Sequence, residues 1–481
     1  MAFKASLRGA LAVLVLVISI PAALSAPPPS VDPAVLARIR DAALQDGWAY
    51  PHLAELTDSI GPRLSGSAGL EAAVDQVASL MRTLGARVSL QPTLVPHWTR
   101  GVEQGALVRY PGQPRGVTQG LHLTALGDSG ATVPEGVTAD VMVVHSVEEL
   151  SARSAEVRGR IVLINRRFNQ HLADNGYAGQ AYGEAGEARF VGPMTASKLG
   201  AVATLVRSVG HASYRLPHTG ATDWDEGEAP APAAAVTAED ADLIDRLAAR
   251  GPVTAHVTLT PTRGVDTPSA NVVADWPGRE HPEEVVVVGG HLDSWDLGTG
   301  AVDDGAGVMS TAAVIETLAR LNLHPRRTIR FVAFTNEENG GRGGLAYAAA
   351  VRDGPGRQVA AIECDLGAGR ALGVQAAVTA AGMTALKEVA HALEPMGATV
   401  LVQRDGVVGS DIRPLQQMGV PGFAPLLDAR HYFDYHHTAA DTLDKVKPEE
   451  LRSQVATLAV LAYFLAESSE TLVSVPVQKG E

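Results

Sequence analysis

Residues 289–308, GGHLDSWDLGTGAVDDGAGV, follow directly on the apolar run Val285–Val288 and decide how the rest of the chain is interpreted. The twenty residues contain one histidine, four aspartates and six glycines. Glycine-rich turns that follow strands are typical of phosphate-binding loops, but Asp303 stands where such a fingerprint requires its third glycine. Because a carboxylate repels a phosphate, the stretch is predicted to bind a cation instead.

The surrounding residues predict the fold that carries this stretch. Val285–Val288 is β-branched throughout, which predicts a strand buried on both faces of a sheet. Apolar patterns predict further strands and helices, namely strands at 328–334 and 359–364 and helices at 307–321, 345–352 and 384–396. Strands that alternate with helices indicate an α/β fold with a mostly parallel sheet and helices on both faces.

Titratable side chains follow each of these strands directly. His291 and Asp293 follow the first strand, Glu337 and Glu338 the second, and Asp365 the third. Sites in such sheets lie beyond the carboxyl ends of the strands, so these side chains are expected on one rim. Aspartates of the turn are placed to cap the next helix, and Asp303 or Asp304 fits that role.

A segment near the C-terminus, Tyr435–Thr442 (YHHTAADT), adds two histidines and a carboxylate. Two imidazoles with three carboxylates suit two Zn²⁺ or similar ions that share one carboxylate. Ions roughly 3.5–4 Å apart can clamp a water, lower its pKa and polarise a carbonyl. A carboxylate outside the metal set must then carry the proton, so the adjacent Glu337 and Glu338 can divide the two roles.

The ordered pattern resembles the co-catalytic dizinc aminopeptidase family, metallopeptidase family 28. The resemblance is carried by His291-x-Asp293, Asp303–Gly307 (DDGAG), Asn336–Glu338 (NEE), Asp365 and His437-Thr438-x-x-Asp441-Thr442. The segment Ile60–Ser67 (IGPRLSGS) resembles the opening segment of the family. The likeness covers most of the mature chain, and it implies a zinc exopeptidase fold of the phosphorylase/hydrolase-like type.

The resemblance implies two Zn²⁺ per chain with Asp303 bridging them. It implies that His291 and Asp365 complete the coordination of one ion, and that Glu338 and His437 complete the coordination of the other. Glu337 would then be the general acid/base.

Four further residues have roles that the sequence leaves less defined. The resemblance implies that Asp293 is hydrogen-bonded to His291 and fixes its tautomer. Asp441 would steady the loop of His437 in the same way. His436 is an alternative ligand, or else a packed or substrate-facing imidazole. Asp411 is either a substrate-pocket residue or a structural hydrogen-bond acceptor.

Changes in composition and residue pattern along the chain predict its domain organisation. Residues 1–25 have a positive start, an apolar run and small residues for cleavage, as in a signal peptide. Residues 26–95 are predicted to begin the peptidase domain, with room for a propeptide at their start. Residues 96–269 show short β-type runs between glycine turns and are predicted to be an inserted β-rich domain, protease-associated by resemblance. Residues 270–470 form the metallopeptidase catalytic domain and 471–481 a tail.

The bulk properties restrict the partners. A formal net charge of −14 argues against nucleic acid and anionic membranes. After removal of the signal peptide no segment is long and apolar enough to cross a bilayer. We therefore expect a secreted or periplasmic protein that acts on peptide substrates, and a homodimer is left open.

The predicted function is a dizinc exopeptidase that cleaves dipeptides or short peptides through a metal-bridging water. Carboxypeptidase, dipeptidase and aminopeptidase specificities remain open, because none of Arg404, Arg413 and Arg430 can be assigned to a substrate carboxylate. One alternative is a single-zinc acyltransferase of the glutaminyl cyclase type on the same scaffold. Another is a non-catalytic, receptor-like scaffold.

Overall fold

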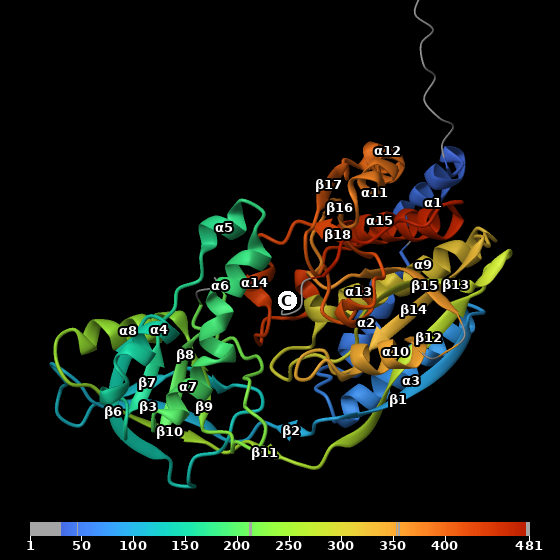
Figure 1. Cartoon of the computed structure of the whole chain (residues 1–481). Helices are drawn as coiled ribbons and strands as arrows, with labels where there is room; N and C mark the ends of the chain where they lie inside the picture. The colour runs from blue at the N-terminus through green and yellow to red at the C-terminus, as the bar shows by residue number, and fades with distance from the viewer. Residues whose placement is uncertain (1–29, 46, 211–213, 353, 355, 478–481) are drawn as a thin grey trace, which may run out of the picture.

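The computed structural model describes residues 30–477 except 46, 211–213, 353 and 355 (Figure 1). The signal peptide predicted for residues 1–25 lies outside the described residues. The described chain forms two lobes, each built on its own eight-stranded sheet. In Figure 1 the lobe drawn mainly in green holds the middle of the chain, and the other lobe combines both chain ends. Among the described residues no helix has the length and apolarity that a bilayer span requires.

The first sheet carries the strands predicted around residues 285–364. In spatial order its strands are β1 (Arg87–Val95), β12 (Thr267–Trp276), β14 (Arg327–Phe334), β13 (His281–His291), β15 (Arg357–Glu363), β18 (Gly422–Leu427), β16 (Ala371–Ala377) and β17 (Val400–Gln403). The central strands β14, β13, β15 and β18 run parallel, whereas β1, β12 and β16 pair antiparallel with their neighbours β12, β14 and β18. The predicted α/β class is confirmed, with the parallel pairing concentrated in the centre of the sheet.

Helices cover both faces of this sheet, as predicted. Val286 and Val288 of β13 pack into one core, and Val285 and Val287 pack into another on the opposite face. Alternate residues of a strand point to opposite faces, so this division follows from the continuous apolar run. The first core is shared by α1 (Pro33–Gln45), α2 (Ala49–Ser59), α3 (Ala68–Thr83), α9 (Ala306–Arg320), α12 (Lys387–Leu393) and α15 (Pro448–Glu467). The second core is shared by α10 (Arg342–Arg352) and α13 (Arg413–Gln417).

The helix predicted at residues 384–396 is divided in the structure. It consists of α11 (Ala380–Ala385), α12 and the 3₁₀ turn Glu394–Met396. Pro395 has no amide hydrogen, so it cannot sit in the interior of an α-helix, and it lies in that closing turn.

The second sheet is built from residues 103–259. In spatial order its strands are β4 (Gln119–Leu121), β3 (Glu103–Arg109), β10 (Thr254–Leu259), β6 (Val137–Val144), β7 (Ile161–Ile164), β8 (Ala203–Arg207), β9 (Ala233–Val236) and β5 (Leu123–Ala125). Helices accompany it, namely α4 (Val147–Ala152), α5 (Gln170–Asp174), α6 (Ala178–Phe190), α7 (Gly192–Lys198) and α8 (Ala238–Ala248). The lobe expected to be β-rich therefore also has a substantial helical part.

The chain enters and leaves the second lobe through paired strands. Val95 at the end of β1 pairs with Thr267 at the start of β12. Beyond them, β2 (Trp98–Thr99) pairs with β11 (Thr262–Arg263). The connection between the lobes is therefore a two-stranded stalk. Farther along the chain, α14 (Tyr432–Tyr435) of the first lobe lies beside α6 of the second (Figure 1).

Candidate metal centre

The predicted ligands meet around the carboxylate of Asp303. His291 Nε2 lies 3.1 Å from Asp303 Oδ1 and 3.5 Å from Asp365 Oδ1. His437 Nε2 lies 3.3 Å from Asp303 Oδ2 and 2.9 Å from Glu338 Oε2. The two oxygens of Asp303 thus face His291 and His437 separately, and each of these histidines faces a second carboxylate. This is the arrangement that a carboxylate shared by two cations requires.

His436 also reaches this cluster. Its Nε2 lies 3.5 Å from Asp303 Oδ2, and its ring stacks on that of His437 with 3.5 Å between the centroids. The ligand atoms of Asp303, His436 and His437 lie within 4.8 Å of one another, as do those of His291, Asp303 and Asp365. The two histidines that the sequence left as alternatives are therefore both in place.

Asp441 holds the main chain of Asp303. Its Oδ1 accepts a hydrogen bond from the amide of Val302 at 2.6 Å, and its Oδ2 accepts one from the amide of Asp303 at 3.2 Å. The carboxylate thus acts on the Asp303 turn, whereas the resemblance implied a role in the loop of His437. Burial and the charge of Asp303 raise the pKa of Asp441 to about 7.

Asp304 links the first strand of the site to the helix that follows. Its carboxylate accepts hydrogen bonds from the amides of His291 and Gly307, both at 3.1 Å. Gly307 is in the first turn of α9, so the predicted capping role belongs to Asp304. The peptide bond between Asp303 and Asp304 is cis.

Asp293 orders the opposite side of the cluster. Its main-chain oxygen accepts a hydrogen bond from His291 Nδ1 at 2.9 Å, which leaves Nε2 directed at Asp303. Its carboxylate accepts hydrogen bonds from the amides of Glu337 at 3.0 Å and Glu338 at 3.2 Å. One residue therefore sets the tautomer of a histidine and the backbone of both glutamates. The hydrogen bond with His291 uses the main chain, and the carboxylate lies 3.9 Å from the same Nδ1.

Arg63 is a buried cation that the sequence did not assign to the site. Its side chain is 0 % exposed and donates to the carbonyls of Gly61, Leu292, Thr299 and Gly300 at 2.7–3.1 Å. Burial lowers the pKa of its guanidinium, and the carboxylates of Asp441, Asp293, Asp304 and Asp303 oppose that shift. Arg63 lies in the segment Ile60–Ser67, so its arginine was the available signal, but three of its four partners are more than 200 residues away.

The second lobe contributes to the same site through Thr219. Its carbonyl lies 3.3 Å from His437 Nδ1, and its amide donates to the carbonyl of His437 at 2.9 Å. His437 has a φ of 61°, in the left-handed region that non-glycine residues rarely adopt, and these contacts hold it there. Arg189 places its Nη1 3.4 Å from the same Nδ1, and Trp295 lies edge-on to the His437 ring. No sequence pattern connected Thr219 or Arg189 to the site.

Asp296, which the sequence left without a role, joins the two lobes. Its carboxylate accepts two hydrogen bonds from Arg100, at 2.8 and 2.6 Å. Arg100 lies between β2 and β3 and also donates to Glu103 at 2.8 Å. Such a bidentate contact between a guanidinium and a carboxylate is among the strong hydrogen bonds of proteins.

The electrostatics of the cluster show an excess of buried negative charge. Burial alone would lower the pKa of His291, but Asp365 and Asp303 raise it well above its ordinary value, and Glu338 does the same for His437. Burial raises the pKa of Asp365 well above its usual range and that of Glu338 to about 7. Bound cations would relieve this excess.

Three buried atoms of the cluster have no hydrogen-bond partner among the described residues. They are Asp303 Oδ2, Glu338 Oε1 and His436 Nδ1. Buried polar atoms are almost always satisfied in proteins, so orphaned atoms in one cluster indicate a missing ligand. The donor set of imidazole nitrogens and carboxylate oxygens fits zinc.

Asp411 lies on the acidic side of the cluster. It is 2 % exposed, and within the described chain neither of its carboxylate oxygens has a hydrogen-bond partner. Burial, Glu363 and Glu337 raise its pKa well above the usual range. Glu363, to which no sequence pattern pointed, accepts hydrogen bonds from the amides of Ser410 and Ile412 at 2.8 Å. Within the described residues the carboxylate of Asp411 thus accepts no hydrogen bond, and its substrate-pocket role stays a prediction.

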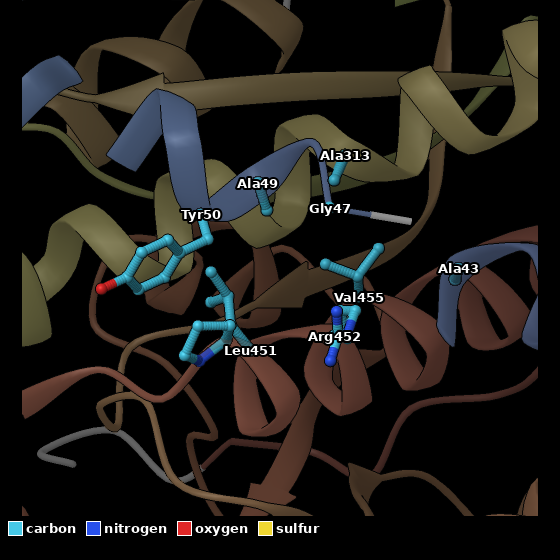
Figure 2. Close-up of a pocket in the computed structure, with 9 residues that line it drawn as sticks. Ala43, Gly47, Ala49, Tyr50, Ala313, Leu451, Arg452 and Val455 are labelled. Atoms are coloured by element: carbon cyan, nitrogen blue, oxygen red, sulfur yellow. The ribbon is translucent and has the colours of Figure 1, made fainter. Parts of the chain in front are cut away.

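A cavity in the interior of the first lobe carries none of these residues. It has a volume of about 20 Å³ and lies between α2, α9 and α15, with Ala49, Ala313 and Val455 among its lining residues (Figure 2). Its size admits a water molecule but no peptide. Two larger cavities lie closer to the cluster. One of about 130 Å³ is lined by Asp365 and Leu366, and one of about 290 Å³ is lined by Leu366.

Comparisons with known proteins agree with the fold. The model of "Peptidase family M28" matches residues 271–462. Carboxypeptidase Q of Homo sapiens is 35 % identical over 426 residues, which cover 88 % of this chain and 86 % of that protein. Carboxypeptidase Q of Rattus norvegicus is 37 % identical, again over 88 % of this chain and 86 % of that protein.

Solved structures show the same relation. A peptidase M28 precursor from Shewanella amazonensis SB2B superimposes with a TM-score of 0.86 at 34 % identity, over 93 % of this chain and 99 % of that one. An aminopeptidase from Aneurinibacillus sp. strain AM-1, at 22 % identity and a TM-score of 0.63, shares the fold over 92 % of this chain and 98 % of that one. The fold, the cluster and these relatives define a metallo-exopeptidase, a hydrolase of peptide bonds. The chain belongs to peptidase family M28.

Proposed function

We propose that the chain is a dizinc exopeptidase that hydrolyses dipeptides or short peptides in a secreted or periplasmic setting. One observation carries the proposal, namely that the two oxygens of Asp303 face His291 and His437 separately. The relatives named carboxypeptidase Q favour a carboxypeptidase or dipeptidase over an aminopeptidase. The leader-like composition of residues 1–25 supports export.

The two ions would be held by the two halves of the cluster. His291 and Asp365 would hold one, Glu338 and His437 the other, and Asp303 would be shared. His437 is assigned in preference to His436 because its Nε2 is 2.9 Å from Glu338 and its Nδ1 is held by Thr219. Zinc bound in such a site polarises a carbonyl and lowers the pKa of a nearby water.

Glu337 is assigned the proton transfer. Its side chain is half-buried at the rim, and its amide is fixed by Asp293 at 3.0 Å. The neighbouring Glu338 points its carboxylate at His437 instead. Glu337 can therefore take the proton from the attacking water and deliver it to the departing amine.

The test combines substrate and metal measurements on one sample. We expect two zinc ions per chain and cleavage of free dipeptides, with loss of cleavage when the C-terminus is blocked. One zinc per chain would favour the acyltransferase of the glutaminyl cyclase type. Two zinc ions without turnover of any peptide would favour the receptor-like scaffold. Cleavage lost on N-terminal blocking alone would contradict the carboxypeptidase assignment.

The matched variants are Glu337→Gln and Glu135→Gln. Glu337→Gln should keep both ions and lose roughly 10²–10⁴-fold in kcat, because it removes the proton carrier only. Glu135 is an exposed glutamate before β6 in the other lobe, so its variant should behave as the wild type. Near wild-type activity of Glu337→Gln would contradict its assigned role.

A further inference from the structure

A cavity of about 290 Å³ opens beside the metal centre. Val302 and Leu366, which adjoin Asp303 and Asp365 in the chain, line it together with Tyr432 of α14. Its volume is at the lower end of the range for small-molecule sites, which suits one residue of a substrate better than a longer peptide.

The lining of this cavity carries more positive than negative charge. Four permanently charged cations and two carboxylates border it, namely Arg370, Arg430, Lys445 and Lys447 against Asp428 and Glu450. His431 also lines it, with its Nδ1 3.0 Å from a carboxylate oxygen of Asp434. This excess is unusual in a chain whose formal net charge is −14.

Some of these charges neutralise one another inside the cavity wall. Arg430 donates two hydrogen bonds to Asp428, at 2.8 and 2.6 Å, and Lys447 pairs with Glu450 at 3.0 Å. Both carboxylates of the lining are thereby used. Of the two remaining cations, Lys445 pairs with Asp444 outside the lining, so the uncompensated charge comes from Arg370.

Arg370 and Lys445 differ in their own contacts. Lys445 pairs with Asp444, and its Nζ lies 5.5 Å from the centroid of the Tyr435 ring. Arg370 is exposed and has no ion pair within the described part of the chain. Its five N–H donors are therefore available to a ligand.

We propose that this cavity binds a carboxylate of the peptide substrate, with Arg370 as its principal contact. The proposal rests on the exopeptidase function and specifies its substrate class. A guanidinium binds a carboxylate through two parallel hydrogen bonds, and the net positive lining favours an anion over a neutral group. The carboxylate comes from an acidic side chain or from the free C-terminus, which share this chemistry.

Matched dipeptides separate the two sources. Glu-Ala is compared with Gln-Ala and Ala-Glu with Ala-Gln, because each pair differs in one side-chain charge and keeps the terminal carboxylate. Ala-Ala is compared with its amide, which removes the terminal charge alone. A preference for the acidic side chain supports that source, and a loss confined to the amide supports the C-terminus.

The variants test whether Arg370 carries the preference. Arg370→Gln should lower kcat/KM for the preferred carboxylate substrate roughly 10- to 100-fold, since hydrogen bonds to a charged group of this kind discriminate by that amount. Its effect on the matched uncharged substrate should stay within about twofold. Arg115→Gln, an exposed arginine between β3 and β4, serves as the control.

Direct binding keeps this inference separate from the peptidase function. In calorimetry the zinc-loaded wild type should bind N-acetylglutamate more tightly than N-acetylglutamine if the side chain is the source, or N-acetylalanine more tightly than its amide if the C-terminus is the source. Arg370→Gln should abolish that difference. Equal binding within both pairs, or equal losses of Arg370→Gln on charged and uncharged substrates, would overturn the proposal. If the wild type cleaves no dipeptide but retains this binding difference, the exopeptidase function fails while the carboxylate site stands.

Discussion

Arg63→Met should destabilise the protein more than any surface arginine change, although Arg63 contacts no substrate. The guanidinium donates to the carbonyls of Gly61, Leu292, Thr299 and Gly300. Methionine has a similar length but no hydrogen-bond donor. The carbonyl of Gly300 keeps a second donor, the amide of Gly305, so at most three carbonyls lose their partner.

The magnitude follows from these contacts. An unsatisfied buried group costs about 1–3 kcal/mol, so three carbonyls cost about 3–9 kcal/mol. Removal of the buried cation also removes the cost of its own desolvation, which offsets part of that loss. We therefore expect a decrease of about 3–5 kcal/mol in the free energy of unfolding. Arg63→Lys keeps the charge but not the planar set of guanidinium N–H donors. Its free energy of unfolding should fall by roughly half as much as that of Arg63→Met.

Urea unfolding of the metal-free and zinc-loaded proteins measures the effect, with Arg115→Met as the surface control. Surface substitutions usually change the free energy of unfolding by no more than about 0.5 kcal/mol. A loss of less than about 1 kcal/mol for Arg63→Met would be close to that range and would refute the reasoning from unsatisfied carbonyls. Equal losses for the methionine and lysine variants would show that the geometry matters and the charge does not.

Two further changes test the metal cluster and its surroundings. Asp303→Asn should reduce zinc binding in both halves of the cluster, because each half uses one oxygen of Asp303, and retention of two ions per chain would contradict a shared carboxylate. His218 is buried, and burial together with His437 and Arg189 lowers its pKa to about 3, so the unfolded chain binds a proton that the folded chain does not. Between pH 6.5 and 5 the free energy of unfolding should therefore fall by about 2 kcal/mol on account of His218, and His218→Leu should remove that part of the pH dependence. Identical pH profiles of both proteins would contradict this.

The meeting of the candidate ligands at the strand ends could be predicted because these residues obey a local rule. His291 is the last residue of β13, and Glu338 and Asp365 follow β14 and β15. These strands are parallel neighbours whose ends share one edge. Apolar runs reveal such strands without knowledge of their partners. The site was therefore visible in the sequence to the extent that it is built from strand ends.

The residues that hold the ligands could not be predicted in this way. Arg63 and Thr219 reach the site from loops, and loops have no periodicity that reports their partners. Asp441 shows the same limit, since its carboxylate was expected at the loop of His437 and instead binds the amides of Val302 and Asp303. Spacing along the chain identifies a carboxylate, but only the fold shows which backbone it contacts.

The paired entry and exit of the second lobe has a consequence for how such a protein can change over time. Because Val95 and Thr267 lie opposite each other, everything between them is topologically a long hairpin loop of the first sheet. Segments of this kind can be lengthened, exchanged or lost without rethreading the host. Here, however, the loop also supplies the carbonyl of Thr219 that orients His437. A segment that could be exchanged as a unit thus also contributes to the candidate metal centre, and any replacement must provide that one carbonyl oxygen again.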